Sequence, residues 1–228
     1  MTFRAGVITF PGSNCDRDIY SILLNFFNAE AEILWHGTSI EKKYDLLVVP
    51  GGFSYGDYLR PGAIARFAPA MKSVVEHAKK GGHVIGICNG FQILCEAGLL
   101  PGALIQNQSL KYVCRTVELR ANPKNRFTAG LEASRIYRIP IGHGDGNYRA
   151  GSDLLKELQD NNQIVFTYDD NPNGSIYDIA GITNKEQRVL GMMPHPERAT
   201  DPLNGGQDGK ILLESFLKAC RESAYAAS

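Results

Sequence analysis

The feature that most constrains the fold of this chain is a short apolar run, His83–Ile87, that passes through glycines into a helix-like segment. Gly86 and Gly90 flank Cys88 in a G-x-C-x-G pattern, the thiol counterpart of the G-x-S-x-G elbow. Because glycine has no Cβ, strand and helix can pack closely around a strained turn. Unpaired N–H groups at the helix start favour a negatively charged sulfur and can hold an oxyanion. The pattern therefore predicts Cys88 as a nucleophile and Asn89, through its backbone N–H, as an oxyanion-hole residue.

Strand-like and helix-like runs alternate along the whole chain with no linker between them, so we expect one α/β domain over residues 1–228. The predicted architecture is a mostly parallel central sheet with helices on both faces. In such sheets, ligands bind at the carboxyl ends of the strands. The expected strands are Arg4–Thr9, Ala31–Trp35, Leu46–Pro50, His83–Ile87, Arg135–Ile139, Ile164–Tyr168, Asp178–Thr183 and Val189–Met193.

Helices are indicated by apolar residues at helical spacing from Ile19 to Phe27 and from Ile211 to Leu217. Ser13 or Asn14 is the expected N-cap of the first of these helices. Pro69 is expected to divide residues 62–80 into a short first piece and a longer second helix.

The best base for a cysteine nucleophile is His195, which follows the last predicted strand in the segment Met193–Arg198. Two prolines are expected to hold this segment extended, so that Glu197 lies on the same side as His195 and fixes its tautomer. A surface loop with an incidental ion pair is the alternative. The segment Met193–Arg198 follows a predicted buried strand, and this position, together with the Cys88 elbow, favours a Cys88–His195–Glu197 triad.

Pro50, Gly51 and Gly52 follow the apolar residues Leu46–Val49, where glycines would let backbone N–H groups face a carbonyl under attack. Gly52 is thus the second predicted oxyanion-hole residue, beside Asn89. A tight turn after a strand is the alternative interpretation of the same pair of glycines.

Charge and cysteine content exclude several classes of function. The 24 basic and 24 acidic residues balance, which leaves no field for steering to nucleic acid or to anionic membranes. No apolar run approaches the roughly 18 residues that span a bilayer, and no signal-peptide layout opens the chain, so a cytoplasmic location is expected. The 5 cysteines form no C-x-x-C pair and suggest neither a disulfide framework nor a structural metal site. Cys95 and Cys220 are expected to pack in the core.

These residues resemble a known family, the class I (triad) glutamine amidotransferases, whose elbow reads G-x-C-x-G-x-Q and whose triad closes with H-P-E. The resemblance implies a flavodoxin-like fold, with Cys88 as nucleophile, His195 as base and Glu197 as orienting carboxylate. It also implies that Gln92, the glutamine of the elbow motif, lies in the glutamine pocket. The expected activity is hydrolysis of L-glutamine to glutamate and ammonia through a cysteine thioester, with no cofactor or metal on this chain.

Two longer stretches, Phe10–Asp18 and Gly51–Gly62, resemble one branch of that family, the glutaminase subunits of a purine-pathway synthase. This implies that the ammonia serves the ATP-dependent conversion of formylglycinamide ribonucleotide to formylglycinamidine ribonucleotide. ATP and magnesium are then expected on a large partner subunit, since this chain lacks a phosphate-binding loop, and a small third subunit is expected in the same complex. Tyr55, Tyr58 and Arg60 are the predicted contacts with the synthase, because tyrosine and arginine often anchor interfaces.

One motif departs from the branch. Gly142–Gly146 reads G-H-G-D-G where the relatives commonly have A-H-G-E-G, so Asp145 is left out of the predicted catalytic set. The resemblance implies that this loop belongs to the glutamine pocket or to the contact with the synthase. A solvated imidazole on a glycine-rich turn is the alternative for His143.

Three other functions remain open on the sequence. A class I glutaminase for a different acceptor would share the triad but should lack the residues Ser54–Arg60. A cysteine peptidase or thioesterase could share the elbow, although Gln92 and the H-P-E sequence argue against it. A silent binding module would have no need of Cys88, His195 and Glu197 together.

Overall fold

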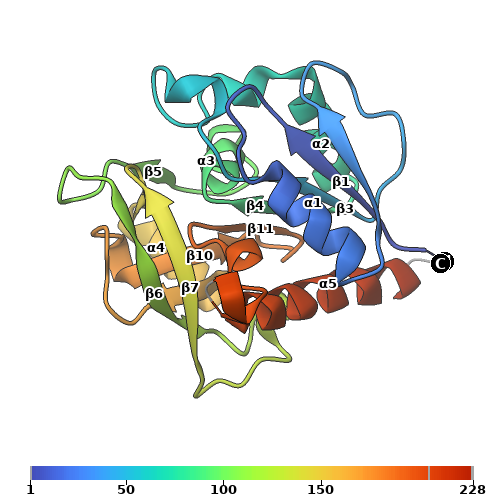
Figure 1. Cartoon of the computed structure of the whole chain (residues 1–228). Helices are drawn as coiled ribbons and strands as arrows, with labels where there is room; N and C mark the ends of the chain where they lie inside the picture. Colours follow the sequence, from blue (N-terminus) through green and yellow to red (C-terminus); the bar gives the residue numbers. More distant parts are fainter. Residues whose placement is uncertain (1, 205, 227–228) are drawn as a thin grey trace.

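A computed structural model describes residues 2–204 and 206–226, so the ends of the predicted domain 1–228 and residue 205 lie outside the described part. A nine-stranded sheet runs through the molecule in the order β2-β1-β3-β4-β11-β10-β9-β6-β7 (Figure 1). The first five of these strands are parallel. They are β2 (Glu30–Trp35), β1 (Arg4–Thr9), β3 (Leu46–Val49), β4 (His83–Ile87) and β11 (Val189–Met192).

An antiparallel extension completes the sheet on the other side of β11. It consists of β10 (Ile179–Thr183), β9 (Ile164–Tyr168), β6 (Val113–Ala121) and β7 (Ile136–His143). A separate two-stranded sheet pairs β5 (Ala103–Ile105) with β8 (Asn147–Arg149). The sequence did not predict β5, β6 or β8. The first half of β6 is mostly exposed, and only alternate residues are buried toward its end. The strand therefore lacks the apolar run that marks a central parallel strand.

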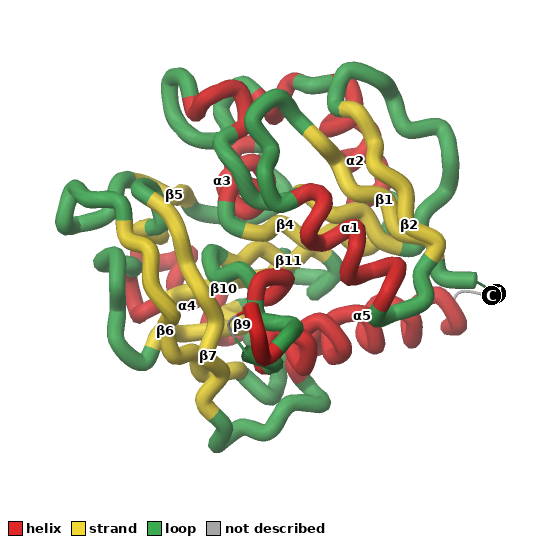
Figure 2. The backbone as a smooth tube through the Cα atoms, in the orientation of Figure 1, coloured by secondary structure: helices red, strands yellow, loops and turns green. Residues whose placement is uncertain are grey.

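Helices cover both faces of the sheet, which confirms the predicted architecture (Figure 2). Helices α1 (Asp16–Asn25) and α5 (Asp208–Ala226) lie on one face, and α2 (Pro69–Lys79) and α3 (Asn89–Glu96) lie on the other. Helix α4 (Ser152–Asp160) was not predicted. Pro69 begins α2 directly after a 3₁₀ turn at Ala65–Phe67, as predicted. No helix of residues 2–204 and 206–226 is long and apolar enough to cross a membrane.

The predicted cap of α1 was wrong. Neither Ser13 nor Asn14 caps the helix; the N-cap position is Cys15, and its side chain makes no capping hydrogen bond. The Ser13 hydroxyl instead accepts the Phe10 N–H at 3.0 Å, and the Asn14 side-chain oxygen accepts the Cys15 thiol at 3.0 Å. Both polar side chains make hydrogen bonds within the turn between β1 and α1, so the helix begins one or two residues later than expected.

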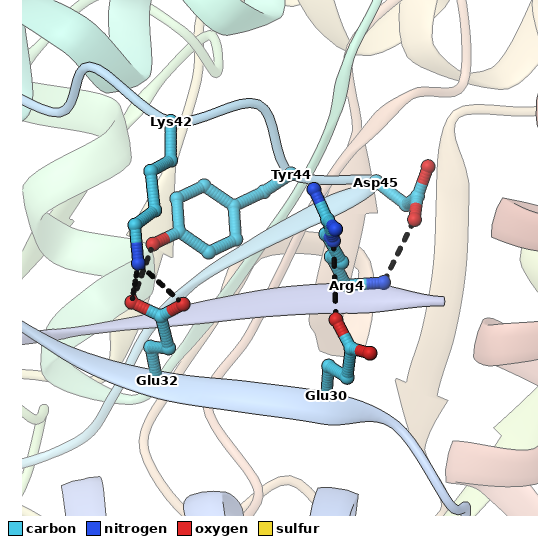
Figure 3. Close-up of polar contacts among 6 residues, drawn as sticks. All are labelled: Arg4, Glu30, Glu32, Lys42, Tyr44 and Asp45. Atoms are coloured by element: carbon cyan, nitrogen blue, oxygen red, sulfur yellow. Dashed lines mark hydrogen bonds and ion pairs between the residues drawn. The ribbon is translucent and has the colours of Figure 1, made fainter. Parts of the chain in front are cut away.

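Ion pairs hold the exposed edge strand β2 to its neighbours (Figure 3). Arg4 on β1 contacts Glu30 at 3.1 Å, and its backbone N–H donates to Asp45 at 2.8 Å. Glu32 accepts hydrogen bonds from Lys42 at 2.9 Å and from the Tyr44 hydroxyl at 3.2 Å. Charged side chains along an open edge discourage pairing with another chain, while exposed ion pairs of this kind add little stability.

The topology brings four chain segments to one edge. Strands β1, β3, β4 and β11 are consecutive parallel neighbours, so their carboxyl ends lie side by side. The segments that follow them carry Cys15, Gly52, Cys88 and His195, in that order. These residues are up to 180 positions apart in the sequence and meet because a parallel sheet aligns its strand ends.

Candidate active site

Cys88 occupies a sharp turn between β4 and α3. Its backbone angles are φ 51° and ψ −107°, a region that side-chain-bearing residues rarely adopt. A Cβ on Gly90 would run into the Val49 carbonyl, and one on Gly86 would lie 2.6 Å from Leu94 Cδ1. The two glycines therefore let the strand and helix approach closely enough to hold Cys88 in its strained conformation, the geometry expected of a nucleophile elbow.

His195 and Glu197 lie together directly after β11. The His195 Nδ1 atom is 2.7 Å from Glu197 Oε1, and both side chains are buried. The predicted extended conformation is wrong, because Pro196–Arg198 forms a 3₁₀ turn. The fixed φ of proline suits the first position of such a turn as well as an extended chain, and the turn still brings the carboxylate to the imidazole.

Charge sets the protonation of this imidazole. Burial alone lowers the pKa of His195, but the Glu197 carboxylate and the interaction with Cys88, by charge and side-chain hydrogen bond, together raise it well above its ordinary value. Since Nδ1 faces Glu197, the other ring nitrogen, Nε2, is left for Cys88. The structure thus brings the three predicted triad residues together in the order nucleophile, imidazole and carboxylate.

A second cysteine lies beside the same imidazole. Cys15 Sγ is 3.8 Å from His195 Nδ1, on the ring atom that also contacts Glu197. Burial raises the pKa of the Cys15 thiol, although the His195 contact opposes this. Sequence analysis did not select Cys15. It could have done so, because Cys15 follows the carboxyl end of β1 just as Cys88 follows that of β4.

The Gly51–Gly52 peptide is oriented by the loop that follows β1. The Gly51 carbonyl accepts the Asn14 and Cys15 N–H groups at 3.4 and 3.3 Å. In a trans peptide the N–H points opposite to the carbonyl, so the Gly52 N–H points away from the loop that follows β1. With φ 147° and a Cβ position only 2.7 Å from the Gly12 carbonyl, Gly52 has no room for a side chain. Both features suit an oxyanion donor beside Asn89.

The Asn89 side chain ties the elbow to the loop that follows β3. Its oxygen accepts the Ser54 N–H at 3.1 Å, and its amide donates to Gln92 Oε1 at 2.9 Å and Asp57 Oδ1 at 3.3 Å. Gln92 in turn donates to the Asp145 carbonyl at 2.7 Å. Burial and the nearby Asp145 charge raise the pKa of Asp57 to about 6, while Asn89 opposes the rise.

The predicted interface residues differ in their surroundings. Tyr55 faces inward, and its hydroxyl lies 2.7 Å from His36 Nδ1. Tyr58 is 74% exposed. Arg60 forms a bidentate pair with Glu96 on α3, at 2.6 and 2.7 Å, with its side chain largely exposed. Of the three, Tyr58 and Arg60 therefore have exposed side chains, whereas Tyr55 is tied to His36 within the molecule.

His143 is buried rather than solvated, so the interpretation as an exposed turn is wrong. It ends β7, and its Nδ1 lies 3.2 Å from the Asn107 side-chain oxygen. Burial, together with the His195 charge, lowers the pKa of His143 to about 4. Cys88 Sγ lies 3.8 Å from the Gly142 carbonyl, which places this segment along one wall of the site.

The strained Cys88 elbow and the buried His195–Glu197 pair, at the carboxyl ends of parallel strands, define a site of the cysteine-nucleophile triad class. A family model described as CobB/CobQ-like glutamine amidotransferase domain matches residues 2–208. The chain belongs to this family. It is 56% identical, over 94% of its length and 99% of theirs, to phosphoribosylformylglycinamidine synthase subunit PurQ from two serovars of Leptospira interrogans, copenhageni and Lai.

Solved structures agree with this assignment. The chain superposes with a TM-score of 0.86 on a chain of PurLQS from Thermotoga maritima, at 44% identity, covering 96% of this chain and 99% of that one. A glutamine amidotransferase from Thermotoga maritima gives a TM-score of 0.59 at 17% identity, over 100% of this chain and 86% of that chain, and shows the shared fold.

Proposed function

We propose that this chain is the glutaminase subunit of phosphoribosylformylglycinamidine synthase, and that it releases ammonia from L-glutamine for purine biosynthesis. The observation that carries the chemistry is the strained Cys88 elbow beside the His195 imidazole, which Glu197 holds at 2.7 Å. The family relationship and the high identity to PurQ subunits support the choice of pathway.

The reaction follows from the geometry. The Cys88 thiolate attacks the side-chain carbonyl of glutamine, and the Gly52 and Asn89 N–H groups stabilise the oxyanion. His195 gives a proton to the departing ammonia, which leaves a γ-glutamyl thioester on Cys88. Water, deprotonated by His195, then hydrolyses the thioester to glutamate and restores the thiolate. Glu197 keeps the imidazole oriented through both halves of the reaction.

The acceptor chemistry is assigned to other subunits. ATP, magnesium and formylglycinamide ribonucleotide would bind a large synthase subunit, and a small third subunit would complete the complex. This chain would deliver ammonia across the interface from a cytoplasmic complex. Gln92, whose amide already contacts the Asp145 carbonyl and Asn89, would line the glutamine pocket.

Covalent labelling tests the nucleophile. A glutamine analogue with an electrophilic side chain should alkylate Cys88 and none of the other four thiols, as mapped by mass spectrometry. Cys114 is the matched control because it is the exposed cysteine. Labelling of Cys15 with Cys88 left free would contradict the proposed nucleophile.

Reconstitution tests the division of labour. In the assembled complex, Cys88→Ala should abolish synthesis from glutamine and leave synthesis from added ammonia intact. Loss of both reactions would mean that this chain also takes part in the amidation. Failure of the chain to assemble with the synthase would instead favour a glutaminase for a different acceptor.

A further inference from the structure

A buried set of metal-binding groups lies beside the catalytic imidazole. The Cys15 sulfur, a His195 ring nitrogen and a Glu197 carboxylate oxygen all lie within 4.8 Å of one another. Cys15 comes from the loop after β1, and the other two come from the segment after β11. All three side chains are buried. In addition, the buried Glu197 Oε2 has no hydrogen-bond partner among the residues that the structure describes.

An orphaned buried carboxylate oxygen needs an explanation, because native structures rarely leave such atoms without a partner. Glu197 Oε1 makes a hydrogen bond with the imidazole, whereas Oε2 has no such partner within residues 2–204 and 206–226. A cation would satisfy it. The Cys15 sulfur and the imidazole supply the second and third ligands at the same place.

The donor set identifies the kind of cation. One thiolate, one imidazole and one carboxylate form a mixed S, N, O set that suits zinc, whereas magnesium and calcium prefer oxygen ligands. Standard zinc–ligand lengths imply an S···N separation of about 3.5 Å and an N···O separation of about 3.3 Å around a tetrahedral ion. The observed separations are 3.8 Å between Cys15 Sγ and His195 Nδ1 and 2.7 Å between that nitrogen and Glu197 Oε1. To complete the site, the S···N separation would shorten by about 0.3 Å and the N···O separation would lengthen by about 0.6 Å.

We propose that Cys15, His195 Nδ1 and Glu197 form a binding site for Zn²⁺ that reversibly inhibits the enzyme. The inhibitory part of this inference rests on the proposed function, whereas the binding part does not. On binding, the Cys15 thiol releases its proton to solvent, and the sulfur lone pair bonds the metal. The proton on His195 Nδ1 is also released to solvent, so the nitrogen lone pair can bond the metal while Nε2 keeps its proton.

Inhibition follows from the position of the remaining ring proton. With Nδ1 bound to zinc, a neutral imidazole carries its proton on Nε2, the nitrogen left for Cys88. His195 then cannot accept a proton from the water that hydrolyses the thioester. The Glu197 carboxylate is also drawn from the imidazole to the metal, so the orienting hydrogen bond is lost.

Cobalt spectroscopy on the full chain tests the site without any activity measurement. Co²⁺ replaces Zn²⁺ in such sites, and a cobalt–thiolate bond gives a charge-transfer absorption band. We expect about one Co²⁺ per chain, a charge-transfer band and displacement by Zn²⁺. Cys15→Ser should abolish the band while keeping a side chain of similar size. Cys15→Ala should also abolish the band. Cys88→Ala and Cys114→Ala are the controls and should retain it.

Two results would overturn the binding site: no charge-transfer band in the wild-type chain, or an undiminished band in both Cys15 variants. Loss of the band in Cys88→Ala or Cys114→Ala would assign the metal to another thiol and would equally contradict the proposal.

Zinc sensitivity of glutamine hydrolysis by the assembled complex tests the inhibitory part. Zn²⁺ should lower the wild-type rate at least tenfold, a chelator should restore it, and Cys15→Ser should show a smaller ratio of rates without and with Zn²⁺. Cobalt binding together with an unchanged rate would remove the inhibitory role. No glutaminase activity in the metal-free wild-type complex would contradict the proposed function instead and leave the cobalt result standing.

Discussion

The Ser54 N–H donates to the side-chain oxygen of Asn89 at 3.1 Å, which joins the loop after β3 to the first residue of the elbow helix α3. The two predicted oxyanion donors, Gly52 and Asn89, therefore belong to segments that are fixed to each other by a buried hydrogen bond. An oxyanion hole works only when its donors are held in place before the reaction.

This link predicts a distinct effect for Asn89→Ala, which keeps the backbone N–H but removes the side-chain contacts. Loss of buried hydrogen bonds should lower the free energy of unfolding by about 1–3 kcal/mol. Displacement of the loop should lower kcat for glutamine hydrolysis by about tenfold to a hundredfold. The measurements are urea unfolding and steady-state kinetics.

Asn184→Ala is the control, since Asn184 accepts the Arg188 and Val189 N–H groups at 2.9 Å in the turn before β11, at the opposite end of that strand from the site. It should lower stability with little change in kcat. Equal kcat losses in the two variants would mean that Asn89 acts only through stability.

The second prediction concerns the charge of Glu197. Because this carboxylate is a main cause of the raised pKa of His195, Glu197→Gln should lower that pKa while keeping the side-chain shape. The imidazole should lose its proton at a lower pH, as followed by NMR titration, and glutamine hydrolysis should fall by as much as about 10⁴-fold but not to zero. Glu118→Gln, which removes an exposed carboxylate paired with Arg138 on β7, should change neither the pKa of His195 nor the rate of glutamine hydrolysis. An unshifted His195 titration would contradict this account.

The parts of the site that sequence could predict are those carried by contiguous patterns. The strand, glycines and helix around Cys88 are adjacent in the chain, and β4 begins and ends at the predicted residues. Glu197 lies only two positions from His195, so the predicted contact between them is present although the predicted extended backbone is wrong. Gly52 could be predicted as an oxyanion donor because it lies just after an apolar strand, and that role stays a prediction.

The remaining parts depend on contacts between distant segments. Cys15 meets His195 only because β1 and β11 belong to the same parallel sheet, and Asn89 meets Ser54 only after the loop folds onto α3. The antiparallel strand β6 is half exposed, so its residues lack a continuous apolar run. The burial of His143 depends in the same way on distant segments, since its ring contacts the Asn107 side chain, and its glycine-rich neighbours left a solvated turn open as an alternative.

A third prediction concerns stability at acidic pH. His83 is buried at the start of β4, and burial followed by repulsion from Arg188, Arg126 and His77 lowers its pKa to about 4. In the unfolded chain its pKa returns to about 6.5, so between these values the unfolded state binds more protons and stability falls as pH falls.

The expected slope is up to about 1.4 kcal/mol per pH unit for each such histidine, and His143 adds a second. His83→Gln should therefore lose less stability than the wild type between about pH 6.5 and pH 5, as measured by urea unfolding. His36→Gln, at a partly exposed site, should alter the slope less. An identical slope in His83→Gln and the wild type would show that His83 does not titrate on unfolding.

The last prediction concerns docking of the synthase on the loop after β3. Tyr58 is largely exposed, so Tyr58→Ala should leave the free energy of unfolding almost unchanged. If the tyrosine anchors the interface, its loss should weaken assembly by tenfold or more, since interface anchors commonly contribute about 2 kcal/mol or more. Arg60→Ala should also weaken assembly and reduce synthase-stimulated glutamine hydrolysis.

Glu96→Gln is the matched control for Arg60, because it breaks the same ion pair and leaves the guanidinium in place. Its effect on stability should be at most about 1 kcal/mol, and assembly should persist. Binding constants from calorimetry decide the matter: unchanged affinity in both Tyr58→Ala and Arg60→Ala would place the synthase elsewhere on the molecule.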